Sequence, residues 1–369
     1  MQNIKLFALY LPQFHPTEEN NKWWGHNYTD WEAVKRATPL YRNHYQPRKP
    51  YRDNYYDLRD EKTLIWQADT ARKYGISGFC IYHYYSNGKL MMEKPAEILL
   101  NNKNINIEYF FCWGNHDFRK NWFGGDKSLL RAQSYGGEDD YLAHIKYLMP
   151  FFKDCRYLKI DNKPVFVIYD INSIPEYDLM IKVWEKELRQ EGFNGINIVA
   201  MKCRPNVKTF ELQGYKDVYA VMPFEPLNVR SNAANGNKFY IFGRRLRTVF
   251  YRCLDKFLGI TKPETFGYVW ANNQMLKSDK CGKQFYCIFP DWDNTPRYGA
   301  RSVLFKGSTP ELFYKYTKQF IQRSREENAE ILFINAWNEW GESAYLEPDE
   351  KNKFKYLEMV SKAVRETIK

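Results

Sequence analysis

The stretch ILFINAWNEWGESAYLEP, residues 331–348, joins a short apolar run to a dense group of aromatic and acidic side chains. Its first four residues are typical of a buried strand. Two indoles follow, Trp337 and Trp340, and the carboxylates Glu339 and Glu342 stand beside them. A helical or turn-like backbone places residues i and i+3 on one side, whereas an extended backbone sends them to opposite faces. We therefore predict that the strand ends in a turn from which both glutamates face one pocket.

Seven other apolar runs have the same character, and most of them alternate with helical patterns. We predict strands at 4–11, 76–82, 107–113, 163–169, 196–201, 218–222, 285–290 and 331–337. We predict helices at 57–74, 95–100, 139–152, 178–190, 310–323 and 356–367. Continuous apolar runs are typical of strands that are buried on both faces. Their regular alternation with helices favours an α/β fold, a (β/α)8 or TIM barrel.

We expect one domain over residues 1–369, since a chain of this length can bury one large core. The strand-to-helix loops are long. The polar-aromatic and Pro-rich stretch up to residue 50 is expected to be an irregular functional loop, and the interval 223–283 to hold a helical insertion. A doubly wound sheet is the alternative fold, but it would require a glycine-rich fingerprint where residues 11–15 read LPQFH.

Composition favours a ligand rich in hydroxyl groups. Aromatic residues make up 18% of the chain, with 29 Tyr and 11 Trp. Their flat apolar faces with a polar handle suit a sugar, although an aromatic-rich core is the alternative explanation.

The net charge of +11 is spread out except at residues 238–263, which carry seven Lys or Arg against Asp255. This segment is typical of a basic amphipathic helix, which is compatible with a membrane surface, a lipid-linked glycan or another acidic partner. It also fits an ordinary helix packed through its aromatic face. We expect no nucleic-acid partner.

Cysteine usage indicates a reducing compartment. The seven cysteines form no CxxC pair, and several stand inside apolar runs such as GFCIY at 78–82. The N-terminal apolar run is too short for a signal peptide, and no run approaches the ~20 residues of a membrane span. We therefore expect a cytoplasmic protein.

The sequence predicts neither a metal nor a cofactor. The six His have no metal-ligand spacing, and there is no phosphate-binding glycine motif. Asp291-Trp292-Asp293 has the DxD form of metal-dependent glycosyltransferases, but so short a triplet often arises by chance. We expect Asp293 and Arg297 at the rim of the site instead.

Glu339 and Glu342 are the main chemical candidates. Glycoside cleavage commonly uses two carboxyl groups, one as acid and the other as base or nucleophile. A pair in one pocket separates its pKa values, so that one member stays protonated near neutrality. The alternative is an exposed acidic turn, which would not need aromatic neighbours. His83 and His116 each follow a predicted strand and are candidate acids or sugar-binding donors, although a lone His there is more often structural.

Seven motifs spread over nearly the whole chain form a specific combination. They are YLPQFHP (10–16), WWG with the following TDW (23–31), HYQPRKP (44–50), YYDLRD (55–60), YGISGFCIYHYY (74–85), DWDNTPR (291–297) and WNEWGESAYLEPD (337–349). Together they closely resemble the WbsX proteins, within the wider group similar to glycoside hydrolase family 99.

The resemblance implies a (β/α)8 barrel and an activity on saccharides. Family 99 enzymes are endo-acting α-mannosidases that retain configuration, and their NEWxE motif matches residues 338–342. By this resemblance Glu339 is the base that deprotonates the sugar 2-hydroxyl, giving a 1,2-anhydro intermediate. Glu342 is then the acid that protonates the leaving oxygen, and afterwards the base for water. WbsX proteins are often associated with O-antigen (lipopolysaccharide) or capsule biosynthesis and have been labelled glycosyltransferases, so the reaction direction stays open.

The chain departs from the family pattern at two places. The family usually has a WANE-like sequence after the third strand, where this chain has Trp113-Gly114-Asn115-His116. An imidazole thus replaces a carboxylate, and substrate contacts there are expected to differ. The family's NEWAEG reads NEWGES here, so Ser343 replaces a Gly.

We predict a retaining glycoside hydrolase-like enzyme that acts on an α-linked, mannoside-type saccharide of a surface polysaccharide, with Glu339 and Glu342 as catalytic residues. A glycosyltransferase and a non-catalytic saccharide-binding barrel are the alternatives. The expected partner is an oligosaccharide or polysaccharide. The predicted substrate-binding residues are Tyr10, His15, Trp24, Trp31, His83, Tyr84, Trp113, Asn115, His116, Asp293, Arg297, Trp337, Asn338, Trp340, Tyr345 and Glu347.

Overall fold

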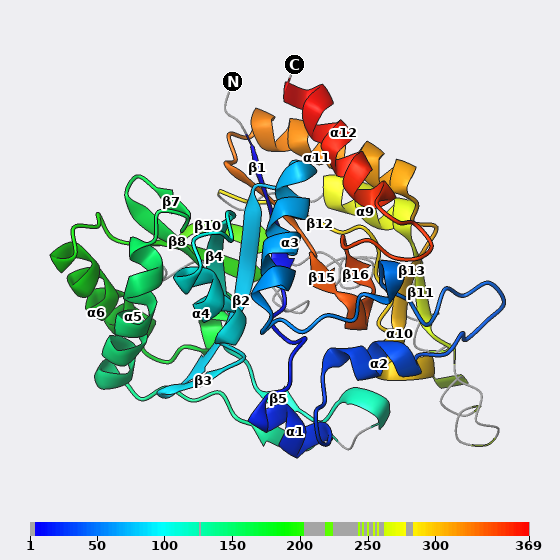
Figure 1. Ribbon diagram of the computed structural model, residues 1–369, viewed down its shortest axis with the longest axis horizontal. Helices are drawn as coiled ribbons and strands as arrows, with labels where there is room; N and C mark the ends of the chain where they lie inside the picture. The colour runs from blue at the N-terminus through cyan, green and yellow to red at the C-terminus, as the bar shows by residue number, and fades with distance from the viewer. Residues whose placement is uncertain are drawn as a thin grey trace.

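Eight parallel strands form a nearly closed barrel in the computed structural model (Figure 1). The structure describes residues 4–124, 127–202, 218–223, 262–277 and 283–368, with six isolated positions between 243 and 257. Around the barrel the strands follow the order β10-β9-β8-β4-β2-β1-β14-β12. The two ends of this order meet at Val221, which bonds to the segment before β12 through Lys283 O and Phe285 N, both at 2.9 Å. The predicted (β/α)8 barrel is confirmed.

Each predicted strand and helix has a counterpart in the structure. The barrel strands are β1 (Lys5–Tyr10), β2 (Gly78–Ser86), β4 (Glu108–Trp113), β8 (Lys163–Ile168), β9 (Asn197–Lys202), β10 (Val218–Pro223), β12 (Cys287–Ile288) and β14 (Ile331–Ile334). The larger helices are α3 (Glu61–Lys73), α4 (Lys94–Asn101), α5 (Glu138–Lys153), α6 (Tyr177–Gln190), α9 (Tyr268–Lys277), α11 (Pro310–Glu326) and α12 (Lys355–Ile368).

Short elements occupy the loops. The helical ones are α1 (Glu18–Trp24), α2 (Asp30–Arg36), α10 (Thr295–Tyr298) and the 3-10 turns η1 (Tyr51–Asp53), η2 (Trp122–Gly124), η3 (Ile171–Ser173), η4 (Gly299–Arg301) and η5 (Trp340–Glu342). The extended ones are β3 (Lys89–Met91), β5 (Phe118–Arg119), β6 (Leu129–Arg131), β7 (Lys159–Ile160), β11 (Glu264–Gly267), β13 (Val303–Lys306), β15 (Asn338–Glu339) and β16 (Ala344–Tyr345).

Capping residues fix where the outer helices begin. α11 follows Thr309, whose hydroxyl accepts a hydrogen bond from Leu312 N at 3.2 Å, and Pro310 occupies its first turn. α3 follows Asp60, whose carboxylate accepts from Lys62 N at 3.0 Å. These caps satisfy backbone donors that would otherwise lack partners at the helix ends.

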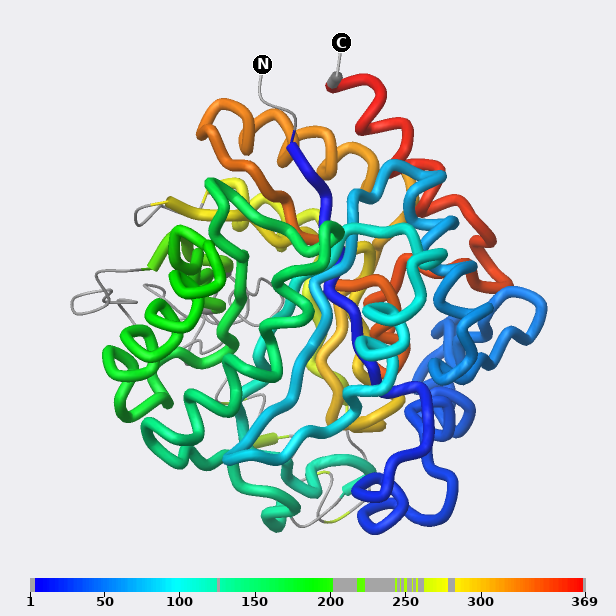
Figure 2. The backbone as a smooth tube through the Cα atoms, turned by 60° about the vertical axis from the view of Figure 1, so that its left-hand side comes forward, coloured from blue at the N-terminus to red at the C-terminus, as the bar shows by residue number. Residues whose placement is uncertain are grey.

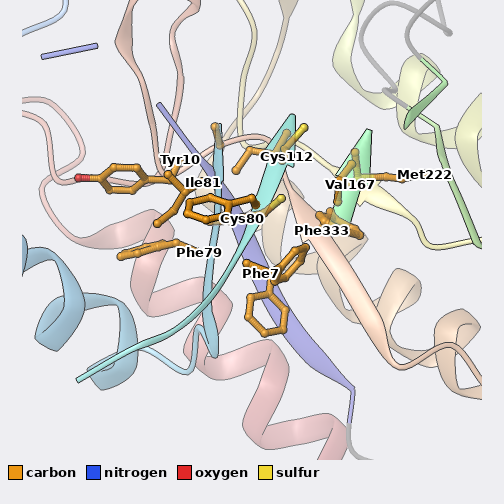
Figure 3. Close-up of a cluster of buried hydrophobic side chains, with 14 of the residues drawn as sticks. Phe7, Tyr10, Phe79, Cys80, Ile81, Cys112, Val167, Met222 and Phe333 are labelled. Carbon is orange, nitrogen blue, oxygen red and sulfur yellow. The ribbon is translucent and has the colours of Figure 1, made fainter. Parts of the chain in front are cut away.

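Aromatic, aliphatic and sulfur-containing side chains pack together in the hydrophobic core, part of which Figure 3 shows. Phe7 of β1 and Phe110 of β4 meet edge to face at 4.8 Å, and Phe110 lies 5.9 Å from Phe333 of β14. Gly78 leaves room for them, because a Cβ there would lie 2.2 Å from Glu108 O and 2.5 Å from the Phe7 ring. The interior is therefore a packed core, and the functional site must lie beyond the strand ends.

The two ends of the barrel differ in character. β1 starts and α12 ends at one end, so both chain termini lie there (Figures 1 and 2). At the other end, beyond the carboxyl ends of the strands, lie α1, α2 and β5 (Figure 1). This second end is where (β/α)8 barrels build their active sites.

Three local expectations are wrong. The loop expected up to residue 50 contains the helices α1 and α2. β2 continues through His83 to Ser86 because its end pairs with β3. β14 ends at Ile334 rather than 337, since Trp337 N turns aside to bond to Leu9 O of β1 at 2.7 Å.

The interval 223–283 is described in part. β11 pairs in parallel with β13, and α9 follows β11 directly along the chain. The basic segment 238–263 lies outside the described residues except for a few positions, four of which are exposed apolar side chains: Leu246, Val249, Phe250 and Phe257. The helices that the structure describes include none with both the length and the apolar character of a membrane span.

Candidate active site

The turn after β14 is anchored on both sides. On one side, Asn338 binds the backbone of Leu11, with its Oδ1 accepting from Leu11 N at 2.8 Å and its Nδ2 donating to Leu11 O at 3.0 Å. On the other, Asp293 N donates to Glu342 O at 2.8 Å. The turn is helical at η5, so Glu339 and Glu342 lie on one side and line the same cavity of about 510 Å³.

Arg297 of α10 holds the acidic side chains of this cavity together. Its Nη2 lies 2.6 Å from Asp30 Oδ2 and 2.9 Å from Glu339 Oε1, and its Nη1 lies 3.3 Å from Glu342 Oε1. Gly341 permits this approach, because a Cβ there would lie 2.7 Å from Arg297 Nε. Asn335 lines the same cavity, and its Nδ2 has no hydrogen-bond acceptor among the described residues, whereas Glu339 Oε1 is held in the ion pair with Arg297. The Asn335 amide is therefore available to donate to a ligand.

One guanidinium does not neutralise three buried carboxyl groups. Burial raises the pKa of Glu339 to about 8; the charge of Arg297 opposes this, and those of Glu342 and Asp30 add to it. Burial also raises the pKa of Glu342. Near neutral pH the pair therefore keeps a proton, which belongs to both residues together. The cavity thus holds an acid and a base side by side.

Aromatic rings wall the cavity. Trp24 of α1 stacks on Trp122 of η2 at 5.2 Å with 13° between the planes, and Arg297 lies under the Trp122 ring at 4.6 Å. Tyr82 and Tyr84 of β2 also line the cavity and stack at 6.1 Å. Flat rings with polar groups between them are suited to a saccharide.

The two acids of the DxD triplet are engaged in structural contacts. Asp291 pairs with Arg48 at 2.6 Å. Asp293 accepts from His44 at 2.7 Å, from Gln46 at 2.8 Å and from Thr295. Burial alone would raise the pKa of Asp293, but these bonds and the charge of Arg48 lower it to about 2. The described residues contain no group of three or more His, Cys, Asp or Glu arranged to hold a metal ion.

Glu347 lies behind the turn, outside the cavity. Its carboxylate accepts from Trp340 Nε1 and Gln67 Nε2 at 2.7 Å and from Tyr56 OH at 2.8 Å. Tyr10 OH extends the network by donating to Gln67 at 2.8 Å. Burial raises the pKa of Glu347 to about 7 despite these bonds. The network therefore supports Trp340, and through it the turn that carries both catalytic candidates.

The structure brings only part of the predicted site together. Besides Glu339 and Glu342, the predicted residues that line the cavity are Trp24, Tyr84, His116 and Arg297. Those that do not line it are Tyr10, His15, Trp31, His83, Trp113, Asn115, Asp293, Trp337, Asn338, Trp340, Tyr345 and Glu347.

Most residues of the second group support the cavity from outside. His83 points away from it and meets His144 at 2.9 Å, and burial lowers the pKa of His83 to about 3. Asn115 binds Asp170 O at 2.8 Å, and Trp31 donates to Tyr56 O at 2.9 Å. Tyr345 stacks on Trp340 at 3.7 Å. His15 is buried, and neither ring nitrogen has a partner among the described residues.

Sequence reasoning missed several residues that line the cavity. They include Gln13, Asn20, Trp23, Asp30, Tyr82, Trp122, Tyr169 and Tyr298. Asp30 stands inside the TDW motif, and the structure buries it. An acidic residue between aromatic residues in that motif could have indicated a functional carboxylate. No signal in the sequence indicated Trp122, because it lies in the β5–β6 hairpin, which was not predicted, in the loop after the predicted strand 107–113.

Two curated relatives are similar in sequence to this chain. The "Uncharacterized protein WxcX" of Xanthomonas campestris pv. campestris (strain B100) is 28% identical over 370 residues, covering 97% of this chain and 49% of the relative. The protein of the same description from strain ATCC 33913 matches at the same identity and coverage. The chain thus spans about half the length of the curated relatives it matches.

Two solved structures superpose on nearly the whole of this chain. A "Glycoside hydrolase-like protein" superposes with a TM-score of 0.59 at 14% identity, covering 99% of this chain and 94% of that one. A GH99 endo-alpha-mannosidase from Bacteroides thetaiotaomicron gives a TM-score of 0.56 at 13% identity, covering 99% and 98%. At these identities the likeness establishes the fold.

The sequence model of one family covers nearly all of the barrel. It matches residues 6–360, from β1 into α12, and thus includes every motif quoted above. Because the match takes in both strand ends and loops, it describes the whole fold rather than one motif. The chain belongs to the family described as "Glycosyltransferase WbsX".

Proposed function

We propose that this chain is a glycoside hydrolase-like enzyme that cleaves an α-linked, mannoside-type saccharide of a surface polysaccharide with retention. One observation carries the proposal. Glu339 and Glu342 contact one buried guanidinium, that of Arg297, inside an aromatic-walled cavity. Such a pair supplies the acid and the base that glycoside cleavage needs.

The contacts to Arg297 support the roles that the family resemblance implies. Its shorter ion pair, 2.9 Å to Glu339 against 3.3 Å to Glu342, supports negative charge on Glu339 when the two residues share one proton, against the burial that raises the pKa of Glu339 to about 8. Glu342 is also the less buried side chain, at 18% exposure against 7%, so it can exchange protons with water. We assign Glu339 as the base toward the sugar 2-hydroxyl, and Glu342 as the acid that protonates the leaving oxygen and then as the base for water.

The test compares Glu339→Gln and Glu342→Gln with the wild-type chain on α-mannosides and O-antigen fragments. Each variant is expected to lose on the order of 10²–10⁴-fold in kcat, and the product anomer seen by NMR to match that of the substrate. Glu326→Gln on α11 is the control, because this glutamate is exposed and remote from the cavity. Full activity of both cavity variants would refute the proposal, and sugar binding without turnover would favour a non-catalytic barrel.

Glycosyl transfer is the second candidate. Arg119 and Arg301 are exposed side chains that line the same cavity. Guanidinium groups suit the phosphate of an activated sugar donor. Calorimetry with a nucleoside diphosphate and with a polyprenyl phosphate tests this candidate, and the absence of binding to both would count against it.

We further propose that residues 1–369 form one catalytic barrel with an insertion at 223–283, and that the basic segment 238–263 contacts a membrane surface or a lipid-linked glycan. The charge of this segment and its four exposed apolar side chains support the contact. Flotation with vesicles of anionic lipid, compared with neutral vesicles, tests it. Equal recovery with both vesicle types would contradict an electrostatic contact.

A further inference from the structure

A second cavity lies apart from the candidate active site, between η1, α3 and the segment that leads into α12. Its volume is about 510 Å³, equal to that of the first cavity, and the two share no lining residue. Trp340 and Glu347 form part of its wall, so the cavity lies behind the turn that carries the two catalytic candidates. Binding sites for small ligands commonly occupy roughly 300–1,000 Å³.

Flat rings and exposed polar groups line this second cavity together. Trp66 of α3 and Tyr51 of η1 are half-buried, and Tyr51 meets Phe354 edge to face at 5.7 Å. Asp53 and Asn54 are exposed beside them. A sugar ring presents an apolar face and a rim of hydroxyls, so it can stack on such rings while bonding to the polar groups.

The described residues of the lining include no two carboxyl groups that are both free to react. The buried Glu347 reaches the wall, but both its oxygens already accept hydrogen bonds: Oε1 from Gln67, and Oε2 from Tyr56 and Trp340. Asp53 is exposed and, among the described residues, has no second carboxylate beside it in the lining. This chemistry suits binding rather than bond cleavage.

We infer that this cavity is a second, non-catalytic saccharide site that holds a distal part of the polysaccharide. The class of ligand rests on the proposed function. A cavity of about 510 Å³ takes only a few sugar units, so most of a polymer lies outside the catalytic cavity. A second site on the same barrel raises the affinity for long chains over short ones without altering the chemistry.

The experiment measures retardation of the chain in native gels that contain soluble α-mannan, and turnover of an α-mannobioside. The variants are Trp66→Ala and Asn54→Ala, whose side chains are at least partly exposed, so both should fold. The control is Tyr314→Ala, which removes a half-buried aromatic ring on α11, outside both cavities. Melting curves by circular dichroism verify that each variant is folded.

We expect Trp66→Ala to weaken polymer binding about 3- to 10-fold, since an aromatic contact contributes ~0.5–1.5 kcal/mol, and to leave mannobioside turnover unchanged. Tyr314→Ala should match the wild type in both. Equal retardation of wild type, Trp66→Ala and Asn54→Ala would overturn the inference, as would the absence of any polymer binding by the wild type. Mannobioside turnover without polymer binding would refute the second site while leaving the proposed function standing. Retardation that depends on Trp66, without mannobioside turnover, would support the second site and count against the proposed function.

Discussion

Nη2 of Arg297 lies 2.9 Å from Oε1 of Glu339, and both side chains are buried. The same nitrogen is 2.6 Å from Asp30, so one cation is divided among several acids. A buried ion pair of this kind is costly to break, because the remaining charges are left without compensation. The contact therefore governs both the shape of the cavity and the protons that it holds.

Replacing Arg297 by Gln should abolish most activity. The change removes the cation that opposes the raised pKa values of Glu339 and Glu342, so both carboxyls become protonated at neutral pH and the base is lost. We expect kcat/KM to fall on the order of 10²-fold or more and the free energy of unfolding to fall by about 3–5 kcal/mol. Arg297→Lys keeps the charge but not the fork that reaches both glutamates, so it should restore stability more than activity. Wild-type kcat/KM in Arg297→Gln would contradict this assignment.

Asp30→Asn should shift the pH profile of kcat/KM. The charge of Asp30 helps to raise the pKa of Glu339 and of Glu342. Without it the shared proton dissociates at lower pH, so the alkaline fall of activity should move toward acid. Asp117→Asn is the matched control, because Asp117 lines the same cavity but pairs with Arg119. An unchanged profile in Asp30→Asn, or an equal shift in both variants, would argue against a role for Arg297 and Asp30 in setting the protons.

The barrel could be predicted because its strands are apolar on both faces and its helices are amphipathic, and these are local patterns. The sequence did not show where each strand ends. His83 looked like a residue beyond a strand end, yet β2 runs to Ser86 because it also pairs with β3. In a strand, neighbouring side chains alternate between faces. Tyr82 and Tyr84 therefore face the cavity, while His83 turns outward to His144.

The candidate site was predictable where one motif holds both partners, as in the turn with Glu339 and Glu342. The site was not predictable where contacts between residues far apart in sequence determine which side chains meet. Asp30 and Arg297 are far apart in sequence and meet only because α2 and α10 pack at the same end of the barrel. Trp340 looked like a sugar platform, but its indole N–H is bonded to Glu347 on the far side of the turn. No pattern of residue types shows which side of a turn an indole faces.

Asp293→Asn should remove a pH-dependent part of the stability. Bonds from His44, Gln46 and Thr295 and the charge of Arg48 lower the pKa of Asp293 from 3.8 to about 2, against the effect of burial. Asp293 stabilises the fold fully at pH values above the pKa it has in the unfolded chain, near 4. This contribution is lost as the pH falls through its folded pKa of about 2. The contribution is about 2 kcal/mol. Urea unfolding at pH 6 and pH 3 should show a smaller pH dependence in Asp293→Asn than in the wild type. The same pH dependence in both proteins would contradict the assignment.

Trp122→Ala should weaken substrate binding more than it slows the reaction. Trp122 is half-buried, stacks on Trp24 and lines the cavity, so the exposed part of its indole can contact a sugar. Loss of one aromatic contact of ~0.5–1.5 kcal/mol corresponds to a rise in KM of up to about 10-fold. Phe123→Ala removes the neighbouring ring, which does not line the cavity, and should leave KM near the wild-type value. If kcat falls in Trp122→Ala while KM is unchanged, the ring acts through Arg297 rather than on the substrate.

Gly341→Ala tests whether the close approach of Arg297 to the turn is required. A Cβ at Gly341 would lie 2.7 Å from Arg297 Nε and 2.9 Å from its Cζ, so the guanidinium must move. Its contacts to Glu339 and Glu342 then lengthen together, because both glutamates lie in the same turn. We expect kcat/KM to fall by at least 10-fold and the alkaline limb of the pH profile to move upward, since a more distant cation opposes the raised pKa of Glu339 less. Gly267→Ala is the control, because Gly267, like Gly341, has no left-handed φ, and its added Cβ would meet only Trp270 Cβ, at an ordinary contact distance of 3.7 Å. A loss of stability without a shift in the pH profile in Gly341→Ala would show that the glycine serves only the turn, and not the position of Arg297.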